Sequence, residues 1–456
     1  MSIYSDTLEK QREYFRAGNT LSYKFRKSML LKLKSTLKDN DERILEALRE
    51  DLGKSGFEGY ATELGIAYEE INYLVKHLKH LMKKTHTATP ITQAVSSSYI
   101  IHEPRGNTLI MSPWNYPVQL TIVPLAGAIA GGNTAIVKPS RYSKEVSSLL
   151  KEILEKIFPE EYIAVFEGGH ETNTELLKLR YDFIFFTGSP NVGRIVHSSC
   201  TENLTPCILE LGGKSPVIID ETAKLKLAAK RLAWGKFLNA GQTCVAPDYL
   251  LIKDGLQDEF IRLFKVEIEK MFSSTPLTSS DLPKIINEKH FERIIGLING
   301  SPAVYGGKHD EKTMKIEPTV LYPVKETDPV MNEEIFGPVL PILTYRTLDE
   351  AIDFIRKREK PLALYIFSEN RKNIERVHAS VSFGGGCVND TVVHLTASGL
   401  PFGGVGNSGM GNYHGKRSFE AFTHDKSIMD KATWMDLPVR YAPFGNKLRL
   451  LRLLMK

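Results

Sequence analysis

The 456-residue sequence is poor in cysteine and in charge of one sign, and each shortage excludes a class of protein. Its four cysteines form no CxxC pair, which disfavours a disulfide framework and indicates reduced thiols in a cytoplasm-like compartment. The net charge is only +5, without a compact basic stripe or a cluster of zinc ligands. We therefore expect a cytoplasmic protein with no metal site and no nucleic-acid partner.

The sequence also lacks an uninterrupted apolar run. Residues 120–137 (LTIVPLAGAIAGGNTAIV) approach the length of a membrane span, but Pro124, the Gly131–Gly132 pair and Asn133 interrupt them. This pattern predicts a helix, a turn and a buried strand, and the first residues do not form a signal peptide. We expect no integral membrane segment.

What is present is a globular composition with a clear alternation of elements. The length suffices for two or three domains. Residues 107–220 alternate apolar strands with helical stretches, which predicts a parallel, doubly wound sheet with ligands at the carboxyl ends of its strands. Amphipathic helices are expected over residues 5–84, an extended arm over 85–103, and a second α/β portion from about 211 to 393. Residues 447–456 predict a helix packed on its own protein, with contact to a membrane surface as the alternative.

Three residues have the chemistry of a catalytic site. Cys244 follows small and polar residues (NAGQTC) and could sit on a turn that exposes its sulfur and its own N–H, although a buried inert thiol fits the motif too. Glu210 ends an apolar strand, where it could act as a general base or form a salt bridge. Asn115 lies in the rigid turn MSPWNYP, which could hold an oxyanion donor or form an ordinary Asx turn.

Two loops are candidates for binding phosphate: residues 186–193 (FTGSPNVG) and 138–140 (KPS). Each follows a predicted strand, so backbone N–H groups and a helix N-terminus could face a pyrophosphate. Neither loop matches GxGxxG, and a plain tight turn remains the alternative.

Taken together, the motifs resemble the aldehyde dehydrogenase superfamily over essentially the whole chain. The motifs are PWNYP (113–117), KPS (138–140), FTGS with Gly193, LELGGKSP (209–216), GQTCVAPDY (241–249), EEIFGPVLP (333–341) and LPFGGVGNSGMGNYHGKRSFEAFTH (400–424). The spacing from Glu210 to Cys244, 244 − 210 = 34 residues, also matches. The short N-terminus and the long glycine-rich signature are most similar to the class 3 or fatty-aldehyde branch.

The resemblance implies a mechanism and its residues. Cys244 is the nucleophile, Asn115 and the Cys244 N–H hold the oxyanion of a thiohemiacetal, and Glu210 activates the water that hydrolyses the thioester. The product is a carboxylic acid, and the cofactor is NAD or NADP. An acylating dehydrogenase that uses coenzyme A, and a catalytically silent dinucleotide-binding protein, are the alternatives.

The resemblance also implies the residues around the cofactor. They are Trp114, Lys138, Ser140, Arg141, Gly188, Ser189, Gly193, Leu211, Glu334 and Phe336. Many relatives have KPSE where this sequence has an arginine, Arg141. An acid would bind the ribose 2′-hydroxyl, whereas arginine can pair with a 2′-phosphate, so we expect NADP to be accepted.

For the substrate, the resemblance implies medium- to long-chain aliphatic or aromatic aldehydes. Tyr116, Thr243 and His394 are expected to line the tunnel, although His394 could be purely structural.

The implied fold has three parts: a Rossmann-type cofactor domain (1–84 and 104–209), an α/β catalytic domain (210–394), and a small β oligomerisation arm with the C-terminal tail (85–103 and 395–456). Arm and tail are expected to join a homodimer. Membrane-bound relatives carry an apolar tail that this sequence lacks, so we expect a soluble enzyme, with peripheral membrane contact limited to the C-terminus.

Overall fold

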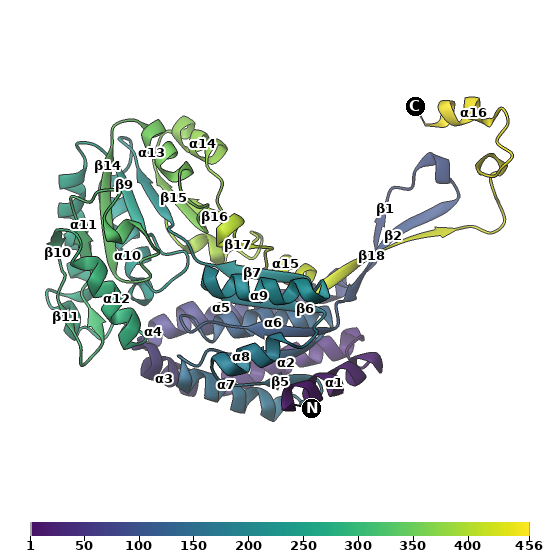
Figure 1. The fold of residues 1–456 in the computed structure, drawn as a ribbon, viewed down its shortest axis with the longest axis horizontal. Coiled ribbons are helices and arrows are strands. Elements are labelled where there is room, and N and C mark those ends of the chain that lie inside the picture. The colour runs from purple at the N-terminus through teal and green to yellow at the C-terminus, as the bar shows by residue number, and fades with distance from the viewer. Residues whose placement is uncertain (1, 456) are drawn as a thin grey trace.

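The computed structural model describes residues 2–455 and consists of two α/β lobes from which a thin arm projects (Figure 1). The first lobe is built on a six-stranded sheet of order β17-β7-β6-β3-β4-β5. All its strands are parallel except β17, which pairs antiparallel with β7. The strands are β3 (Asn107–Met111), β4 (Thr134–Lys138), β5 (Ile163–Val165), β6 (Phe183–Gly188), β7 (Cys207–Leu211) and β17 (Gly409–Met410).

Helices cover both faces of this sheet, so the predicted doubly wound arrangement is confirmed. One face packs against α1 (Ile3–Arg16), α8 (His170–Leu177) and α9 (Pro190–Asn203). The other packs against α2 (Tyr23–Asp39), α5 (Gly65–Leu81), α6 (Gln119–Gly131) and α7 (Lys144–Ile157). The apolar stretch 120–137 forms most of α6 and β4, as predicted. Within residues 2–455, no helix combines the length and apolar character needed to cross a membrane.

Between α2 and α5 the chain makes three short helical segments that approach the second lobe. They are α3 (Asp41–Leu52), α4 (Gly56–Gly59) and the π-helical turn η1 (Tyr60–Leu64).

The second lobe has a seven-stranded sheet of order β10-β13-β14-β9-β8-β15-β16. Its strands are β8 (Pro216–Ile219), β9 (Tyr249–Lys253), β10 (Ala303–Tyr305), β13 (Thr319–Leu321), β14 (Val339–Tyr345), β15 (Ala363–Phe367) and β16 (Gly385–Val388). Its helices are α10 (Leu225–Phe237), α11 (Gln257–Phe272), α12 (Glu288–Ile298), α13 (Leu348–Arg356) and α14 (Arg371–Ser380), and a small hairpin joins β11 (His309–Asp310) to β12 (Lys315–Ile316). The glycine-rich strand β16 is an unpaired edge within the described residues.

The arm is a three-stranded antiparallel sheet of β1 (Thr85–Thr87), β2 (Ser96–Pro104) and β18 (Thr423–Lys431). It ends in α16 (Lys447–Leu454), far from both lobes (Figure 1). The predicted C-terminal helix therefore forms, but the expectation that it packs on its own protein is wrong within one chain. β18 carries the tail away from the body, and Leu448, Leu450 and Leu453 are exposed.

The C-terminal boundary of the first lobe also differs from the expectation. All of residues 395–456 were expected to belong to the arm and tail. Instead, β17 returns to pair with β7, and α15 (Lys416–Ala421) packs on α6. Close contact is possible because α6 presents Gly131: a Cβ there would lie 2.8 Å from the carbonyl oxygen of Phe422. The arm begins only at Thr423.

Candidate active site

The loops that follow the parallel strands of the first sheet share one edge, because their carboxyl ends point the same way. The loop after β3 carries Trp114, Asn115 and Tyr116, and the turn after the neighbouring strand β6 carries Gly188 and Ser189. From these two strands the chain continues toward opposite edges of the sheet. The crevice between the loops is therefore the kind of switch point at which open α/β sheets bind ligands.

Cys244 lies in the loop between α10 and β9, which we call the cysteine loop (residues 238–248). Its backbone is tightly wound: Asn239, Ala240 and Gly241 have φ angles of 52°, 51° and 74°. Glycine is required at 241, because a Cβ there would lie 2.2 Å from the carbonyl oxygen of Gly337. The turn expected around Cys244 is present and leaves its side chain partly exposed.

Hydrogen bonds join the cysteine loop to the loop after β3. The Asn115 side-chain amide donates to the carbonyl oxygen of Gln242 at 3.0 Å, and the hydroxyls of Tyr116 and Thr243 lie 2.6 Å apart. Asn239 donates its side-chain N–H to the Asn115 carbonyl oxygen at 2.8 Å. The Asn115 amide uses one N–H for its bond to the Gln242 carbonyl oxygen, and its second N–H is available to a ligand.

Acidic neighbours and burial act together on the Cys244 thiol. Burial, followed by the nearby carboxyls of Glu334 and Glu210, raises its pKa to about 12, against the opposing effect of the Cys244 and Val245 backbone N–H groups. The thiol is therefore protonated near neutral pH. Loss of its proton requires either a base or a positive charge beside it.

Glu210 lies next to last in β7, with its side chain on the sheet face opposite to Leu209 and Leu211. The side chain is buried, and neither carboxylate oxygen has a hydrogen-bond partner within residues 2–455. Burial raises the pKa of Glu210 well above its usual value. Thr187 of β6 is the register partner of Glu210 in the neighbouring strand. The hydroxyls of Thr187 and of Tyr413 are likewise buried without partners among the described residues. Such a group of unpaired polar atoms is suited to holding a water molecule.

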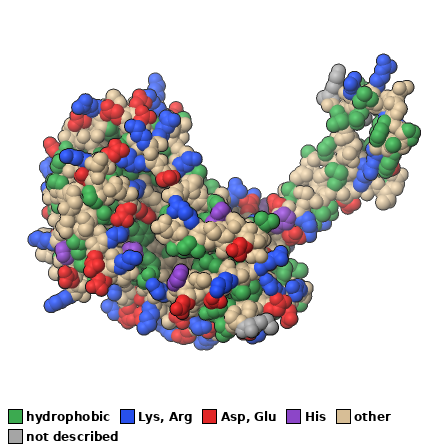
Figure 2. Space-filling model, in the orientation of Figure 1, with side chains coloured by type: hydrophobic (Ala, Val, Ile, Leu, Met, Phe, Trp, Pro, Cys, Tyr) green, Lys and Arg blue, Asp and Glu red, His purple; other side chains and the backbone are tan. Residues whose placement is uncertain are grey.

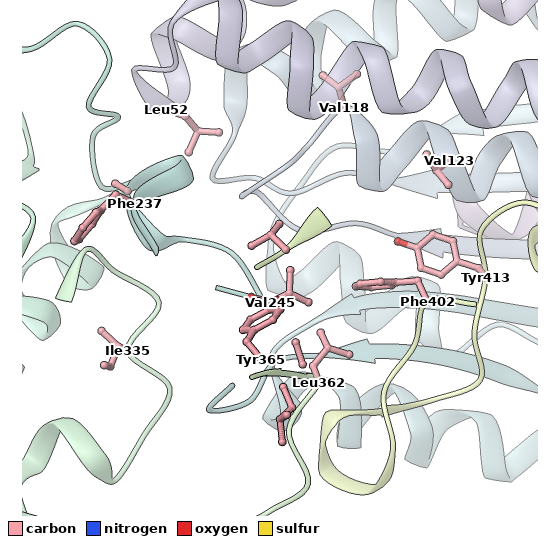
Figure 3. Packing of buried hydrophobic residues seen from close by; sticks show 14 of the residues in the cluster. Leu52, Val118, Val123, Phe237, Val245, Ile335, Leu362, Tyr365, Phe402 and Tyr413 are labelled. Atoms are coloured by element: carbon pink, nitrogen blue, oxygen red, sulfur yellow. Dashed lines mark hydrogen bonds between the residues drawn. The ribbon is translucent and has the colours of Figure 1, made fainter. Parts of the chain in front are cut away.

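Aromatic side chains lie near the cysteine loop. Burial raises the pKa of Tyr116, Tyr365 and Tyr413 well above its usual value, and the charge of Cys244 adds to this effect at each of them. Tyr365 donates its hydroxyl to the carbonyl oxygen of Val245 at 2.6 Å, and Figure 3 shows these two residues side by side.

The His394 ring packs edge-on against the ring of Tyr365, a member of this cluster. Its ring centroid is 6.1 Å from that of Tyr365 and it stacks on Phe402, also at 6.1 Å, while its Nδ1 is 3.6 Å from the Cys387 sulfur. Burial lowers the pKa of His394 to about 4, so the imidazole is neutral near pH 7. The structure thus places this predicted substrate residue among aromatic rings close to the cysteine loop.

The β6–α9 turn has the form of a pyrophosphate site. Ser189 is the N-cap of α9, is exposed, and makes no side-chain bond to its own helix. The first N–H groups of the helix have no intrahelical partners and favour an anion. Gly193 allows α9 to approach β7 closely, since a Cβ there would lie 2.6 Å from Leu211 Cδ2.

Glu334 and Phe336 lie beside the loop after β7. The Glu334 side chain lies directly against Gly212, where an added Cβ would be only 2.2 Å from its Oε2. Its other oxygen, Oε1, is buried without a partner in the part of the chain that the structure describes. Burial, followed by the charge of Asp248, raises the pKa of Glu334 to about 8. The Phe336 ring packs edge-on against Trp114, with 5.4 Å between centroids. The unpaired acceptor oxygen of Glu334 fits a sugar hydroxyl.

Lys138, Ser140 and Arg141 follow β4. Lys138 is buried and donates to the Pro139 carbonyl oxygen at 2.7 Å, and burial, then the charge of Arg141, lowers its pKa to about 8. The Ser140 hydroxyl accepts the backbone N–H of Tyr142 at 3.2 Å. Arg141 is exposed, with its guanidinium 5.0 Å from the centre of the Tyr142 ring, and can reach a ligand.

The sequence analysis missed several residues of the site. His290 packs against Trp114 with 5.3 Å between ring centroids. Lys54, Glu58 and Glu63 lie beneath the Asn115 and cysteine loops. One signal was available for Glu63: it falls within the apolar stripe of Leu64, Ala67, Ile71 and Leu74, where a charged residue is unusual unless it has a partner.

Comparison with known proteins gives a consistent result. The sequence profile of the aldehyde dehydrogenase family matches residues 4–428. The chain is 46% identical over 458 residues to a 4,4'-diaponeurosporen-aldehyde dehydrogenase of Staphylococcus aureus, covering 100% of both chains. It is 44% identical over 459 residues to aldehyde dehydrogenase family 3 member B1 of Rattus norvegicus, covering 100% of this chain and 98% of that one.

Two further likenesses concern cofactor and fold. A rat aldehyde dehydrogenase named dimeric and NADP-preferring is 44% identical over 432 residues, covering 95% of each chain. A solved structure, the substrate-bound state of Staphylococcus aureus AldH, superposes with a TM-score of 0.99 over 100% of both chains at 46% identity.

The high pKa of Cys244 predicts how its thiol reacts in the protein alone. Because only the thiolate is alkylated, the rate should rise about tenfold per pH unit between about pH 7 and pH 9 without levelling off. Mass spectrometry of the Cys244 peptide after timed exposure to iodoacetamide measures this rate, and Cys244→Ala identifies the signal. A plateau below about pH 9 would show that the thiol is already activated without a ligand.

Proposed function

Because the chain belongs to the aldehyde dehydrogenase family, in its class 3 branch, and oxidises aldehydes to carboxylic acids, we propose that Cys244 is its nucleophile. The observation that supports this assignment is the meeting of two loops: the Asn115 amide bonds the Gln242 carbonyl oxygen, two residues before Cys244, and the Glu210 carboxyl is close to the thiol. The comparisons do not favour the two alternatives, coenzyme A-dependent acylation and a catalytically silent protein.

In the first stage, the Cys244 sulfur bonds to the aldehyde carbon and the carbonyl oxygen becomes an oxyanion. The free N–H of the Asn115 amide and the Cys244 backbone N–H donate to this oxygen, in a site that excludes most water. Burial raises the pKa of both nearby carboxyls, Glu210 and Glu334, so each is a stronger base than an exposed carboxylate when it is ionised, and in that form either can take the thiol proton.

NAD(P) bound at the switch point would supply the acceptor for the hydride that leaves the substrate carbon. The unpaired Glu334 oxygen, the α9 N-terminus and Lys138 fit its ribose and phosphate groups. The substrate is then a thioester of Cys244. Glu210 takes a proton from water, the hydroxyl adds to the thioester carbon, and the carbon–sulfur bond breaks to release the carboxylic acid and the Cys244 thiolate.

We propose medium- to long-chain aliphatic or aromatic aldehydes as substrates. The support is the aromatic surround of the thiol: Tyr116 and Tyr365 flank it, and the neutral ring of His394 stacks on Phe402. These rings suit an apolar chain better than a charged one.

Cys244→Ala and Glu210→Gln should fail at different stages. Turnover of an aldehyde panel, followed by cofactor absorbance, should fall by about 10⁴-fold or more in Cys244→Ala. Glu210→Gln should release about one equivalent of NAD(P)H per site and then turn over about 100-fold more slowly, because the thioester persists. Cys200→Ala, which removes a buried thiol in α9, is the matched control and should retain turnover. Full activity of Cys244→Ala would end the mechanism.

We further propose that the enzyme accepts NADP as well as NAD. Arg141 is exposed at the edge of the crevice, next to Lys138, and no acid occupies its position. A guanidinium there can pair with a ribose 2′-phosphate.

Arg141→Glu should discriminate between the cofactors. Loss of the charged pair should raise the KM for NADP about 10- to 100-fold, while the KM for NAD changes little because it lacks the phosphate. Steady-state kinetics with each cofactor give this ratio. Arg43→Ala, which removes an exposed arginine paired with Glu152, is the control. An equal rise for both cofactors would show that Arg141 does not contact the 2′ position.

For the assembly we propose a homodimer joined through the arm. The arm exposes apolar side chains, among them Ile91, Met429, Trp434 and Phe444, and Figure 2 shows hydrophobic and basic side chains together near its tip. An exposed apolar surface of this kind indicates an interface. The outer strand β18 and the edge strand β16 also have unpaired backbone edges within the described residues, and such edges add strands from a partner.

Sedimentation velocity tests the dimer. A mass of twice 51.3 kDa is expected, and Met429→Asp should shift it toward the monomer because it places a charge in the interface. Met410→Asp changes an exposed methionine of the body and should not. The alternative for α16, contact with a membrane surface, predicts instead a monomer that co-sediments with phosphatidylglycerol vesicles.

A further inference from the structure

Three charged side chains from the segment before α5 are buried beneath the two active-site loops. Lys54 and Glu63 form an ion pair, with 2.7 Å between Nζ and Oε1, and neither side chain is exposed. Glu58 lies next to them. Buried ion pairs contribute little net stability because both charges lose their hydration, so stability alone does not account for this one.

Lys54 contacts the Asn115 peptide directly. Its Nζ donates to the Asn115 carbonyl oxygen at 3.1 Å and lies 4.0 Å from the centre of the Tyr116 ring. The same carbonyl oxygen accepts the side-chain N–H of Asn239. Two donors on one carbonyl fix the plane of the peptide that carries the Asn115 side chain.

Glu63 holds the other end of the same loop. Its Oε2 accepts the backbone N–H groups of Val118 and Gln119, each at 3.0 Å, where α6 begins. These N–H groups have no partner within the helix, and the positive end of the helix dipole favours a carboxylate there. Lys54 and Glu63 together therefore fix the backbone from Asn115 to the first turn of α6.

The backbone of this segment is unusual at the point where it supplies Glu63. η1 is a π-helical turn, closed by a bond from the Gly65 N–H to the Tyr60 carbonyl oxygen. Such turns are rare and occur often at functional sites. Glu58, five residues before Glu63, accepts the backbone N–H of Asn239 at 2.7 Å and so holds the left-handed turn of the cysteine loop.

We propose that Lys54 and Glu63 are positioning residues for the reaction: they hold Asn115 so that its amide meets the oxyanion. The inference rests on the proposed role of Asn115 in the oxyanion site. An oxyanion donor works only where it is held before charge develops, and a displacement of about 1 Å can reduce the rate about 100-fold.

Kinetics of Lys54→Met and Glu63→Gln in the full-length enzyme test the proposal. Each should lower kcat by about 10- to 100-fold, with a smaller change in the KM for the cofactor, because the α9 N-terminus, Lys138 and Glu334 lie outside the loop that Lys54 and Glu63 hold. In an Asn115→Ala background, Lys54→Met should cause almost no further loss, since the group that it positions is gone. The double variant Lys54→Met/Glu63→Gln removes both charges, so it should fold even where a single variant does not, and its kcat should still be low.

Arg26→Met is the matched control for a purely structural effect. Arg26 is also buried and bonds the other end of α6, at the Ala130 carbonyl oxygen. Its loss should lower the apparent unfolding temperature without lowering kcat per folded enzyme.

Two results would overturn the proposal: an unchanged kcat in Lys54→Met or in the double variant, or the same fold-loss from Lys54→Met with and without Asn115. Failure of the proposed function would look different, because Cys244→Ala or Asn115→Ala would then keep full activity.

Discussion

The active site depends on the hydrogen-bonded junction between a loop of the first lobe and a loop of the second. Asn115, Asn239 and Gln242 exchange side-chain and backbone bonds across this junction, so neither loop has its observed shape without the other. Cys244, the proposed nucleophile, comes from the second lobe, and Asn115 and Glu210, its proposed partners, come from the first. The proposed site therefore exists only where the two lobes pack together.

Burial has the same effect on three groups at this junction. It raises the pKa of the Cys244 thiol, of Glu210 and of Glu334, and all three favour the neutral form for the same reason. A cationic ligand beside them would reverse part of this penalty. The thiol is therefore less nucleophilic in the protein alone than it would be beside a cationic ligand.

Local pattern was enough to predict the two sheets and the order of the site loops. Strand–helix alternation located β3 to β7, whereas Asn115, Glu210 and Cys244 each had a structural alternative and received their roles only from the resemblance of the combined motifs to a family. What local pattern could not supply were contacts between distant segments. β17 is two residues long and pairs with β7 across a long stretch of chain, since Gly409 pairs with Glu210 and 409 − 210 = 199, so no periodicity marks it. Lys54 and Glu58 lie in a segment whose partners are more than 60 and 180 residues away, respectively. The helix α16 forms as predicted, but its expected packing on its own chain was wrong. The leucine spacing predicts an apolar face, and does not identify the surface that covers it.

The pairing of β2 with β18 has a consequence for biosynthesis. Thr423 pairs with Pro104, so 319 residues of chain separate the two strands of the arm. Loop closure over that distance is slow, and a chain emerging from the ribosome completes both lobes before β18 becomes available. The arm is then the last part of the molecule to form. In the homodimer proposed above, the order of synthesis would separate folding from assembly, because two subunits could meet through the arm only after each had folded.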